Sequence, residues 1–248
     1  MSVNNSVIIH LVRHAQGPHN VVEWGARFRD PFLTAEGLQQ CARVQQRFSN
    51  ILSGIISSPQ RRTIQTALVC FPFAIGDGLQ IYLLADLQEV GDAPVCVGMD
   101  IATIQNDFGP VVNVDYLDEN WNQTPLALSF HPQDVMERAR RARVAIREFA
   151  RAVIDNGQGT YDNGSIHLAV VTHSLLIPFL TNELENITYF ANAECRSYMF
   201  TDIRGTDDQA TIVETQESID RRPRPRPAPP TPAPRPAPAP APAPEPGS

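Results

Sequence analysis

Short apolar runs alternate with longer amphipathic segments along the first 220 residues of the chain. Nearly continuous apolar runs of about four to eight residues are typical of strands that are buried on both faces. Apolar residues that recur every three or four positions are typical of helices packed on a core. The pattern predicts strands at 7–12, 54–57, 81–84, 166–171, 197–203 and 210–215, and helices at 34–51, 60–70, 132–156 and 174–184.

This alternation of elements defines a fold class. Strands that alternate with helices build a parallel sheet with helices on both faces. We therefore expect an α/β fold, a three-layer sandwich with a mostly parallel central sheet, formed by a single domain at 1–220. The segment at about 91–132 is expected to form a lid inserted into this domain. Thr34 is expected to cap the first helix, because its hydroxyl can accept an N–H of the first turn.

The composition changes sharply near residue 220. Of the 22 prolines, 13 lie at 221–248, where they mostly alternate with alanine. Proline lacks a donor N–H and fixes φ, so this segment should be disordered or form polyproline II. It contains an Arg-x-x-Pro-x-x-Pro pattern at 224–230, of the kind that the aromatic-lined grooves of proline-recognition domains bind. A solvated tail without a partner is the alternative that we favour.

All 20 basic residues are arginines, which excludes chemistry that requires a lysine, such as a P-loop or a Schiff base. The net charge of −7 is divided unevenly, because residues 1–220 carry −11 and residues 221–248 carry +4. The acidic body argues against nucleic acid as a partner, since phosphate neutralisation needs a basic face. One face of the helix at 132–156 carries four arginines that we expect to be solvated and paired with acids: Arg140, Arg143, Arg147 and Arg151.

The four cysteines lie far apart and include no Cys-x-x-Cys pair. We expect buried free thiols rather than a zinc site or a disulfide. No apolar run approaches the roughly 20 residues of a membrane span, and the first residues lack a basic-then-apolar signal pattern. The sequence therefore predicts no metal or other cofactor, no membrane partner and a cytoplasmic location.

Two of the predicted strands end in histidine. Arg13 and His14 end the first strand, and Thr172 and His173 end the strand at 166–171. Ligands of open α/β sheets bind outside the carboxyl ends of the strands, so the two histidines can meet in one crevice. A single histidine at a strand end would more often be structural, but the joint pattern favours a functional site.

A third strand ends just before Ser58 and places Arg61 and Arg62 at the start of the next helix. An arginine there, the positive helix terminus and Arg13 can together hold a phosphate dianion. Histidines and arginines without a set of metal ligands suggest phosphoryl transfer through a histidine nucleophile, whose reactive form is neutral imidazole. Neighbouring arginines disfavour protonation of the imidazole and so keep the nucleophile available.

These residues resemble the motifs of the histidine phosphatase superfamily, in its phosphoglycerate-mutase-like branch. The resemblance covers residues 6 to about 203, with the motifs in the family's order and spacing. Several segments look most like the fungal members, whose substrate is unassigned. The matching motifs are Arg13-His14-Ala15-Gln16 with Asn20, Leu33-Thr34-Ala35-Glu36-Gly37, Ser58-Pro59 with Arg62 and Gln65-Thr66-Ala67, Leu87-Gln88-Glu89, and Thr172-His173-Ser174.

The resemblance implies a role for each matching residue. His14 would be the nucleophile, which forms a phosphohistidine. Arg13, Arg62 and His173 would surround the phosphoryl oxygens and stabilise their developing charge. Glu89 would protonate the leaving oxygen and then activate the water that hydrolyses the intermediate.

Other assignments leave alternatives open. Asn20 matches the family asparagine that contacts the phosphoryl group, and Asp92 is the alternative to Glu89 as the general acid. The family's usual Arg-His-Gly and Thr-His-Gly are Arg-His-Ala and Thr-His-Ser here. Ala15 should be tolerated if the local backbone is ordinary. Ser174 would either crowd the phosphate or bind it through its N–H and hydroxyl, and we favour binding.

Three functions are compatible with these residues. The leading one is a cofactor-independent phosphatase that acts on a small phosphorylated molecule. A mutase would return the phosphoryl group to bound product and hold a carboxylate-bearing substrate with additional basic groups, whereas the expected lid has six acidic residues and no arginine or lysine. A non-catalytic scaffold that binds a phosphorylated ligand, with the tail as its recruiting arm, would not need His14 and Glu89. Apolar residues of the lid also suit a bulky or apolar alcohol phosphate.

Overall fold

The computed structural model of the chain describes residues 6–48, 51–157, 159, 161–162, 164–185, 187 and 189–222. Most of the proline-rich segment, including its pattern at 224–230, lies outside the described residues. The domain boundary at residue 220 therefore stays a prediction, as does a partner for the tail. None of the helices in the described part of the chain is long and apolar enough to cross a membrane.

The strands of the described residues form one sheet in the order β4-β3-β2-β6-β1-β7-β8, with β5 paired to β6. The neighbours from β4 to β1 are parallel, whereas β7, β8 and β5 are antiparallel to their partners. This sheet confirms the predicted α/β fold with a mostly parallel sheet. The strands are β1 Ser6–Arg13, β2 Leu52–Ser57, β3 Ile81–Leu83, β4 Val112–Asn113, β5 Tyr161–Asp162, β6 Ser165–Thr172, β7 Cys195–Phe200 and β8 Ile212–Glu214.

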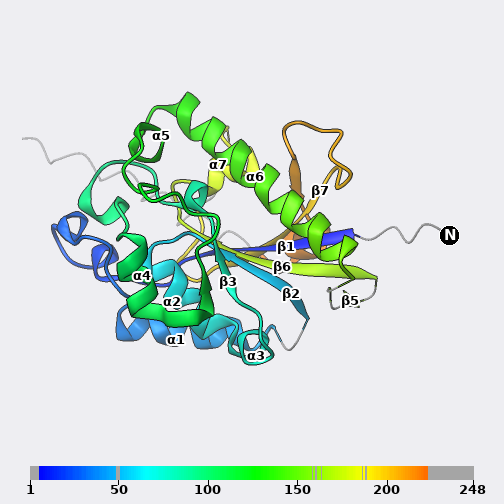
Figure 1. The fold of residues 1–248 in the computed structure, drawn as a ribbon, viewed down its shortest axis with the longest axis horizontal. Helices are drawn as coiled ribbons and strands as arrows, with labels where there is room; N and C mark the ends of the chain where they lie inside the picture. Colours follow the sequence, from blue (N-terminus) through cyan, green and yellow to red (C-terminus); the bar gives the residue numbers. More distant parts are fainter. Residues whose placement is uncertain are drawn as a thin grey trace, which may run out of the picture.

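Helices cover both faces of the sheet, with α6 and α7 on one face and α1, α2 and α3 on the other (Figure 1). The α-helices are α1 Ala35–Gln45, α2 Arg61–Cys70, α3 Pro72–Gly76, α4 Ile101–Phe108, α5 Pro125–Leu128, α6 Pro132–Asp155, α7 Ile177–Thr181 and α8 Gln216–Arg221. Short 3₁₀ helices are η1 Pro18–Asn20, η2 Gly25–Arg27, η3 Ala85–Leu87, η4 Pro94–Cys96 and η5 Gly109–Val111.

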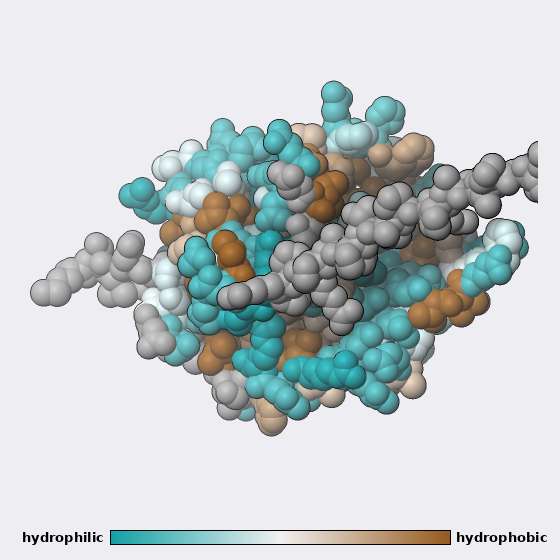
Figure 2. Space-filling view, turned by 180° about the vertical axis from the view of Figure 1, so that it is seen from behind, coloured by the Kyte–Doolittle hydropathy of each residue, from teal (hydrophilic) through white to brown (hydrophobic). Residues whose placement is uncertain are grey.

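Successive side chains of the strands point to opposite faces of the sheet and so divide the core into two layers. Ile9 and Leu11 of β1 belong to the cluster beneath α6, whereas Val12 belongs to the cluster beneath α1 and α2. Successive side chains of a strand point to opposite faces, so a strand covered on both sides needs apolar residues at nearly every position. The described residues that are visible in Figure 2 are mainly hydrophilic, and hydrophobic residues lie on that face in separate patches.

Two predicted helices are shorter in the structure. The helix predicted at 34–51 begins after its N-cap Thr34, as expected, but ends at Gln45. Phe48 lies beyond that end and packs edge-on against Phe71, with ring centroids 5.3 Å apart. The helix predicted at 174–184 is reduced to α7, because Pro178 has no N–H to donate and is tolerated only in a first turn.

The arginine stripe of α6 is not a solvated face, which corrects the prediction. Arg143 and Arg147 are buried, and they donate to backbone carbonyls rather than to acids. Their partners lie in α7 and in the turn between β7 and β8, where the chain leaves carbonyls without ladder partners. Arg140 and Arg151 do pair with acids, namely Glu137 and Glu148 of the same helix.

The segment predicted as a lid is partly built into the sheet. Within 91–132, β4 extends the sheet beside β3, and Ile104 of α4 and Trp121 are buried in the cluster beneath α2. The remainder crosses the end of the molecule where the parallel strands have their carboxyl ends, next to η1 and η2 (Figure 1). Movement of this segment as a lid stays a prediction.

Candidate active site

The carboxyl ends of β1 and β6 lie side by side and bring two histidines together. Arg13 is opposite Thr172 in the parallel register, and the N–H of His14 donates to the Thr172 carbonyl at 2.9 Å. His14 and His173 therefore leave the sheet at neighbouring points. Their ring centroids are 5.1 Å apart, so the two strand-end histidines meet as the sequence predicts.

His14 is almost completely buried and presents one nitrogen for chemistry. Its Nδ1 lies 2.7 Å from the carbonyl oxygen of Ala15. Because a carbonyl oxygen only accepts hydrogen bonds, Nδ1 carries the proton and Nε2 carries the lone pair. Burial, and then the nearby Arg62 guanidinium, hold the pKa of His14 well below its usual 6.5. The imidazole is therefore neutral, which is its nucleophilic form.

Arg62, in the first turn of α2, places a buried guanidinium beside the histidines. Its Nη1 donates to the Val95 carbonyl at 2.9 Å, and its Nη2 donates to Gln60 Oε1 at 3.0 Å. The same Nη2 lies 3.1 Å from Nδ1 of His173, which must accept because a guanidinium has no lone pair to offer. Nε2 of His173 then carries the proton and donates to Ser58 Oγ at 2.9 Å. These bonds fix both side chains before any substrate binds.

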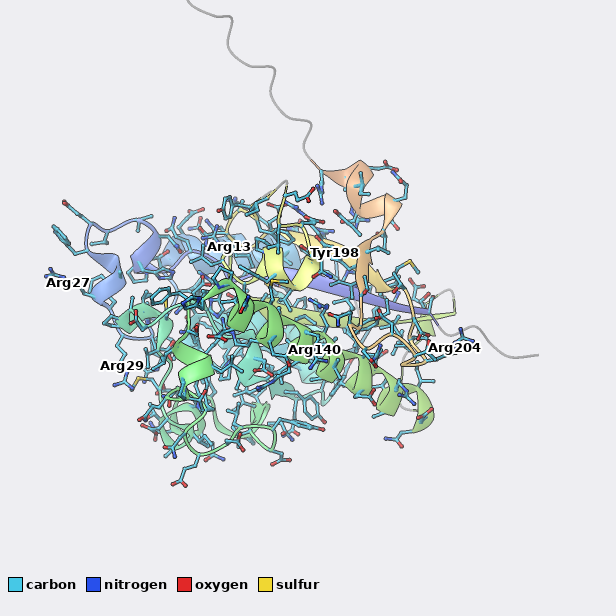
Figure 3. All side chains as sticks on the ribbon, turned by 90° about the horizontal axis from the view of Figure 1, so that it is seen from above. Arg13, Arg27, Arg29, Arg140, Tyr198 and Arg204 are labelled. Atoms are coloured by element: carbon cyan, nitrogen blue, oxygen red, sulfur yellow. The ribbon has the colours of Figure 1, made fainter. Side chains whose placement is uncertain are left out.

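Arg13 supplies a second cation. It is half-buried, and its Nη1 donates to the carbonyl of Phe190 at 2.7 Å. In the view of Figure 3, Arg13 lies well inside the outline of the molecule, whereas Arg27 and Arg204 lie at its edge. Arg13 and Arg62 are close enough for each to disfavour the charge of the other. A doubly charged anion between them would relieve this repulsion.

Glu89 contributes a buried carboxyl group to the site, with 8% of its surface exposed. Its Oε1 accepts the N–H of Val90 at 2.9 Å, and its own N–H donates to Gln60 Oε1 at 3.2 Å. Burial raises the pKa of Glu89 above its usual 4.5, against the opposing effect of Arg62. A carboxyl group with a raised pKa holds the proton that a general acid must donate. Asp92, the alternative acid, is exposed.

Three other predicted positions lie around this centre. Asn20 is exposed, and its Oδ1 accepts the N–H of Gly17 at 3.0 Å, so this oxygen holds the turn of η1 and leaves Nδ2 for a ligand. Ser174 is half-buried and directly follows His173. Ala15 is buried and its φ lies outside the left-handed region, so alanine fits there, as expected.

The sequence reasoning missed two buried residues that hold the site together. Gln60 accepts from both Arg62 and Glu89 and donates its Nε2 to the Val95 carbonyl at 3.1 Å. Asp30 accepts the N–H of Met99 at 3.1 Å and lies 3.9 Å from Arg62 Nη1. Burial raises the pKa of Asp30 to about 6. Gln60 could have been recognised because it directly precedes the helix that begins with Arg61. The loop around Asp30 has no hydrophobic periodicity from which its structure could be predicted.

A third imidazole, also missed, lies next to the nucleophile. The ring centroids of His19 and His14 are 5.3 Å apart. Arg61, in contrast, turns away from the histidines and pairs with Asp107, with Nε 2.7 Å from Oδ2.

Among the described residues, no three His, Cys, Asp or Glu side chains are grouped so that they could hold a metal ion. The four cysteines are free and buried, as predicted.

The residues at these strand ends lie within a region of the chain that matches a known protein family. The family model described as the histidine phosphatase superfamily (branch 1) matches residues 9–217. The chain therefore belongs to the histidine phosphatase superfamily. None of the curated proteins matches the chain.

Solved structures with a similar fold include three hydrolases. Mycobacterial glucosyl-3-phosphoglycerate phosphatase has a TM-score of 0.53 and 19% identity, over 85% of this chain and 97% of that one. The ecdysone phosphate phosphatase of Bombyx mori, solved with tungstate, has a TM-score of 0.56 and 13% identity, over 79% and 93%. The structure described as mycobacterial hydrolase 2 has a TM-score of 0.54 and 20% identity, over 84% and 89%. At these identities the similarity concerns the fold.

Proposed function

We propose that this protein is a phosphatase that hydrolyses a small-molecule phosphate ester through a phosphohistidine on His14. The observation that carries the proposal is the neutral His14 imidazole, whose Nδ1 is occupied by the Ala15 carbonyl and whose Nε2 lone pair is available beside Arg62 and His173. Two structural neighbours, the glucosyl-3-phosphoglycerate phosphatase and the ecdysone phosphate phosphatase, are phosphatases of small phosphorylated molecules, which supports the same reaction class.

In the first step, Nε2 of His14 attacks the phosphorus atom and the bond from phosphorus to the ester oxygen breaks. Glu89 donates its proton to that oxygen, so the product leaves as a neutral alcohol. Arg13, Arg62 and Nε2–H of His173 bind the phosphoryl oxygens, where negative charge is concentrated. The Nε2–H of His173 would exchange the hydroxyl of Ser58 for a phosphoryl oxygen.

In the second step, the Glu89 carboxylate takes a proton from a water molecule, whose oxygen attacks the phosphorus. The bond from phosphorus to Nε2 breaks, and inorganic phosphate and neutral His14 are regenerated. The burial of Glu89 supports both roles, because a pKa raised toward neutrality allows one carboxyl group to give and then take a proton. A scaffold that only binds phosphate has no use for such a group.

Detection of the covalent intermediate tests this proposal. Incubation with a phosphate ester followed by a rapid quench should add roughly 80 Da, one phosphoryl group, to the peptide that contains His14. The adduct should be labile to acid, as phosphoramidates are. The His14→Ala variant should lack both the adduct and turnover, and full turnover by this variant would exclude the mechanism.

A further inference from the structure

His19 lies next to the nucleophile His14. It belongs to η1, and its ring centroid is 5.3 Å from that of His14 with the planes at 44°. His173 lies 5.1 Å from His14 by the same measure, so the nucleophile has two imidazole neighbours. The sequence motif assigns no role to His19, because it assigns the neighbouring Asn20 instead.

The backbone around His19 leaves room for this ring and for little else. A Cβ atom added to Gly17 would lie 2.7 Å from Cε1 and 2.8 Å from Nδ1 of His19. One added to Gly25 would lie 2.4 Å from the Cα of His19. Real Cβ atoms do not approach other atoms so closely. Gly17 must therefore be glycine while the ring of His19 stays where it is, and Gly25 must be glycine while the backbone of His19 stays where it is. The Nδ1–Cε1 edge is thus packed on Gly17.

The two ring nitrogens of His19 differ in their surroundings. Nδ1 is buried without a hydrogen-bond partner, whereas Nε2 is not buried and makes no hydrogen bond to the described part of the chain. A buried N–H without an acceptor is rarer and more costly than a lone pair without a donor. The favoured tautomer therefore carries its proton on Nε2. Nε2–H is therefore the hydrogen-bond donor that a ligand can reach.

The charges around His19 indicate what its N–H would meet. Burial, followed by the Arg62 and Arg13 guanidiniums, lowers the pKa of His19 to about 3. The ring is therefore a neutral hydrogen-bond donor in the free protein, and the same two cations attract a dianion to the space beside it. A phosphoryl group at Nε2 of His14 would lie within the same cluster of cations and imidazoles.

We propose that His19 is a further phosphoryl-binding residue, which donates Nε2–H to an oxygen of the group that His14 attacks. This inference rests on the proposed function and assigns one more donor to the phosphate pocket. His19 contacts the transferred group rather than the leaving alcohol, so its effect should be the same for every ester. That property separates it from a general acid.

The test compares His19→Leu, which removes the donor, with His19→Gln, which keeps an N–H in place of Nε2. His131→Gln serves as the matched control, because His131 is an exposed histidine at the start of α6. Turnover is measured with p-nitrophenyl phosphate and with glycerol phosphate. Binding of orthovanadate, which adopts the five-coordinate geometry of the transition state, is measured by calorimetry and needs no turnover.

His19→Leu should lower kcat/KM by roughly 10- to 100-fold on both esters and weaken orthovanadate binding by a similar factor. His19→Gln should recover most of both losses, and His131→Gln should match the unmodified protein. The proposal is overturned if a folded His19→Leu stays within twofold, or if His19→Gln is as impaired as His19→Leu. Failure of the proposed function would appear separately, as absent turnover in the unmodified protein or as full turnover by His14→Ala.

Discussion

Replacing Glu89 by glutamine removes a proton donor while leaving the shape of the site intact. The amide oxygen of glutamine can accept the N–H of Val90 that Glu89 Oε1 accepts at 2.9 Å, and the side-chain volume is nearly unchanged. An alkoxide leaving group needs a proton as its bond breaks, whereas p-nitrophenolate leaves without one. Glu89→Gln should therefore lower kcat/KM on an alkyl phosphate by about 10²- to 10⁴-fold, which is about 3–5 kcal/mol of barrier, and lower kcat/KM on p-nitrophenyl phosphate far less.

The same substitution should not weaken substrate binding and can strengthen it. The carboxylate of Glu89 is close enough to favour the charge of Arg13 and of Arg62, and it repels a phosphate dianion. Its neutral replacement should leave KM unchanged or lower it, while kcat falls. Because burial raises the pKa of Glu89, the unmodified protein should lose activity on alkyl phosphates as pH rises through that pKa, and the variant should lack this alkaline limb.

The control for this prediction is Asp92→Asn, at the exposed alternative acid. Steady-state kinetics of both variants on glycerol phosphate and on p-nitrophenyl phosphate decide between the two residues. A leaving-group-dependent loss in Asp92→Asn but not in Glu89→Gln would exchange their roles. Equal losses of kcat/KM in Glu89→Gln on both esters would instead indicate a damaged phosphate pocket and refute the reasoning, because kcat/KM does not include the later hydrolysis step, in which Glu89 acts as the base for every ester.

Three other outcomes are expected. Arg62→Lys should lower kcat/KM by about 100-fold or more, because a lysine ammonium cannot keep the bonds to Val95 and Gln60 while it binds phosphate in the guanidinium's geometry. Steady-state kinetics measure this loss, and circular dichroism checks that the variant is folded. A chain ending at Arg222 should keep kcat/KM within about twofold, or ~0.4 kcal/mol, and a tenfold loss would mean that the tail reaches the site. Burial lowers the pKa of His10 to about 3, so the unfolded chain, with a pKa near 6.5, takes up the proton first as pH falls. The stability that this shift provides is present above about pH 6.5 and is lost as the pH falls toward 3. Between pH 7 and pH 5, the free energy of unfolding measured with urea should therefore decrease by about 2 kcal/mol more in the unmodified protein than in His10→Asn.

The local pattern of the sequence was sufficient for the parallel sheet and for the residues at its strand ends. Apolar strands that alternate with helices are buried on both faces in a parallel sheet, and the carboxyl ends of its strands then lie along one edge. Arg13, His14 and His173 therefore meet for a reason that can be read from the chain. Arg62 follows because the first turn of a helix after a strand lies at the same edge.

Only the tertiary structure decided the burial and pairing of side chains between distant segments. Arg143 lies on the polar stripe of an amphipathic helix, yet it is buried because residues more than 30 positions away bring carbonyls that need its donors. Gln60 acquires its role from Arg62 and Glu89, and His19 from the fold of a loop without a period. Periodicity reports which face of an element is apolar, but it contains no information on which polar groups arrive from elsewhere. The strand-end residues were therefore predictable, and the network that orients them was not.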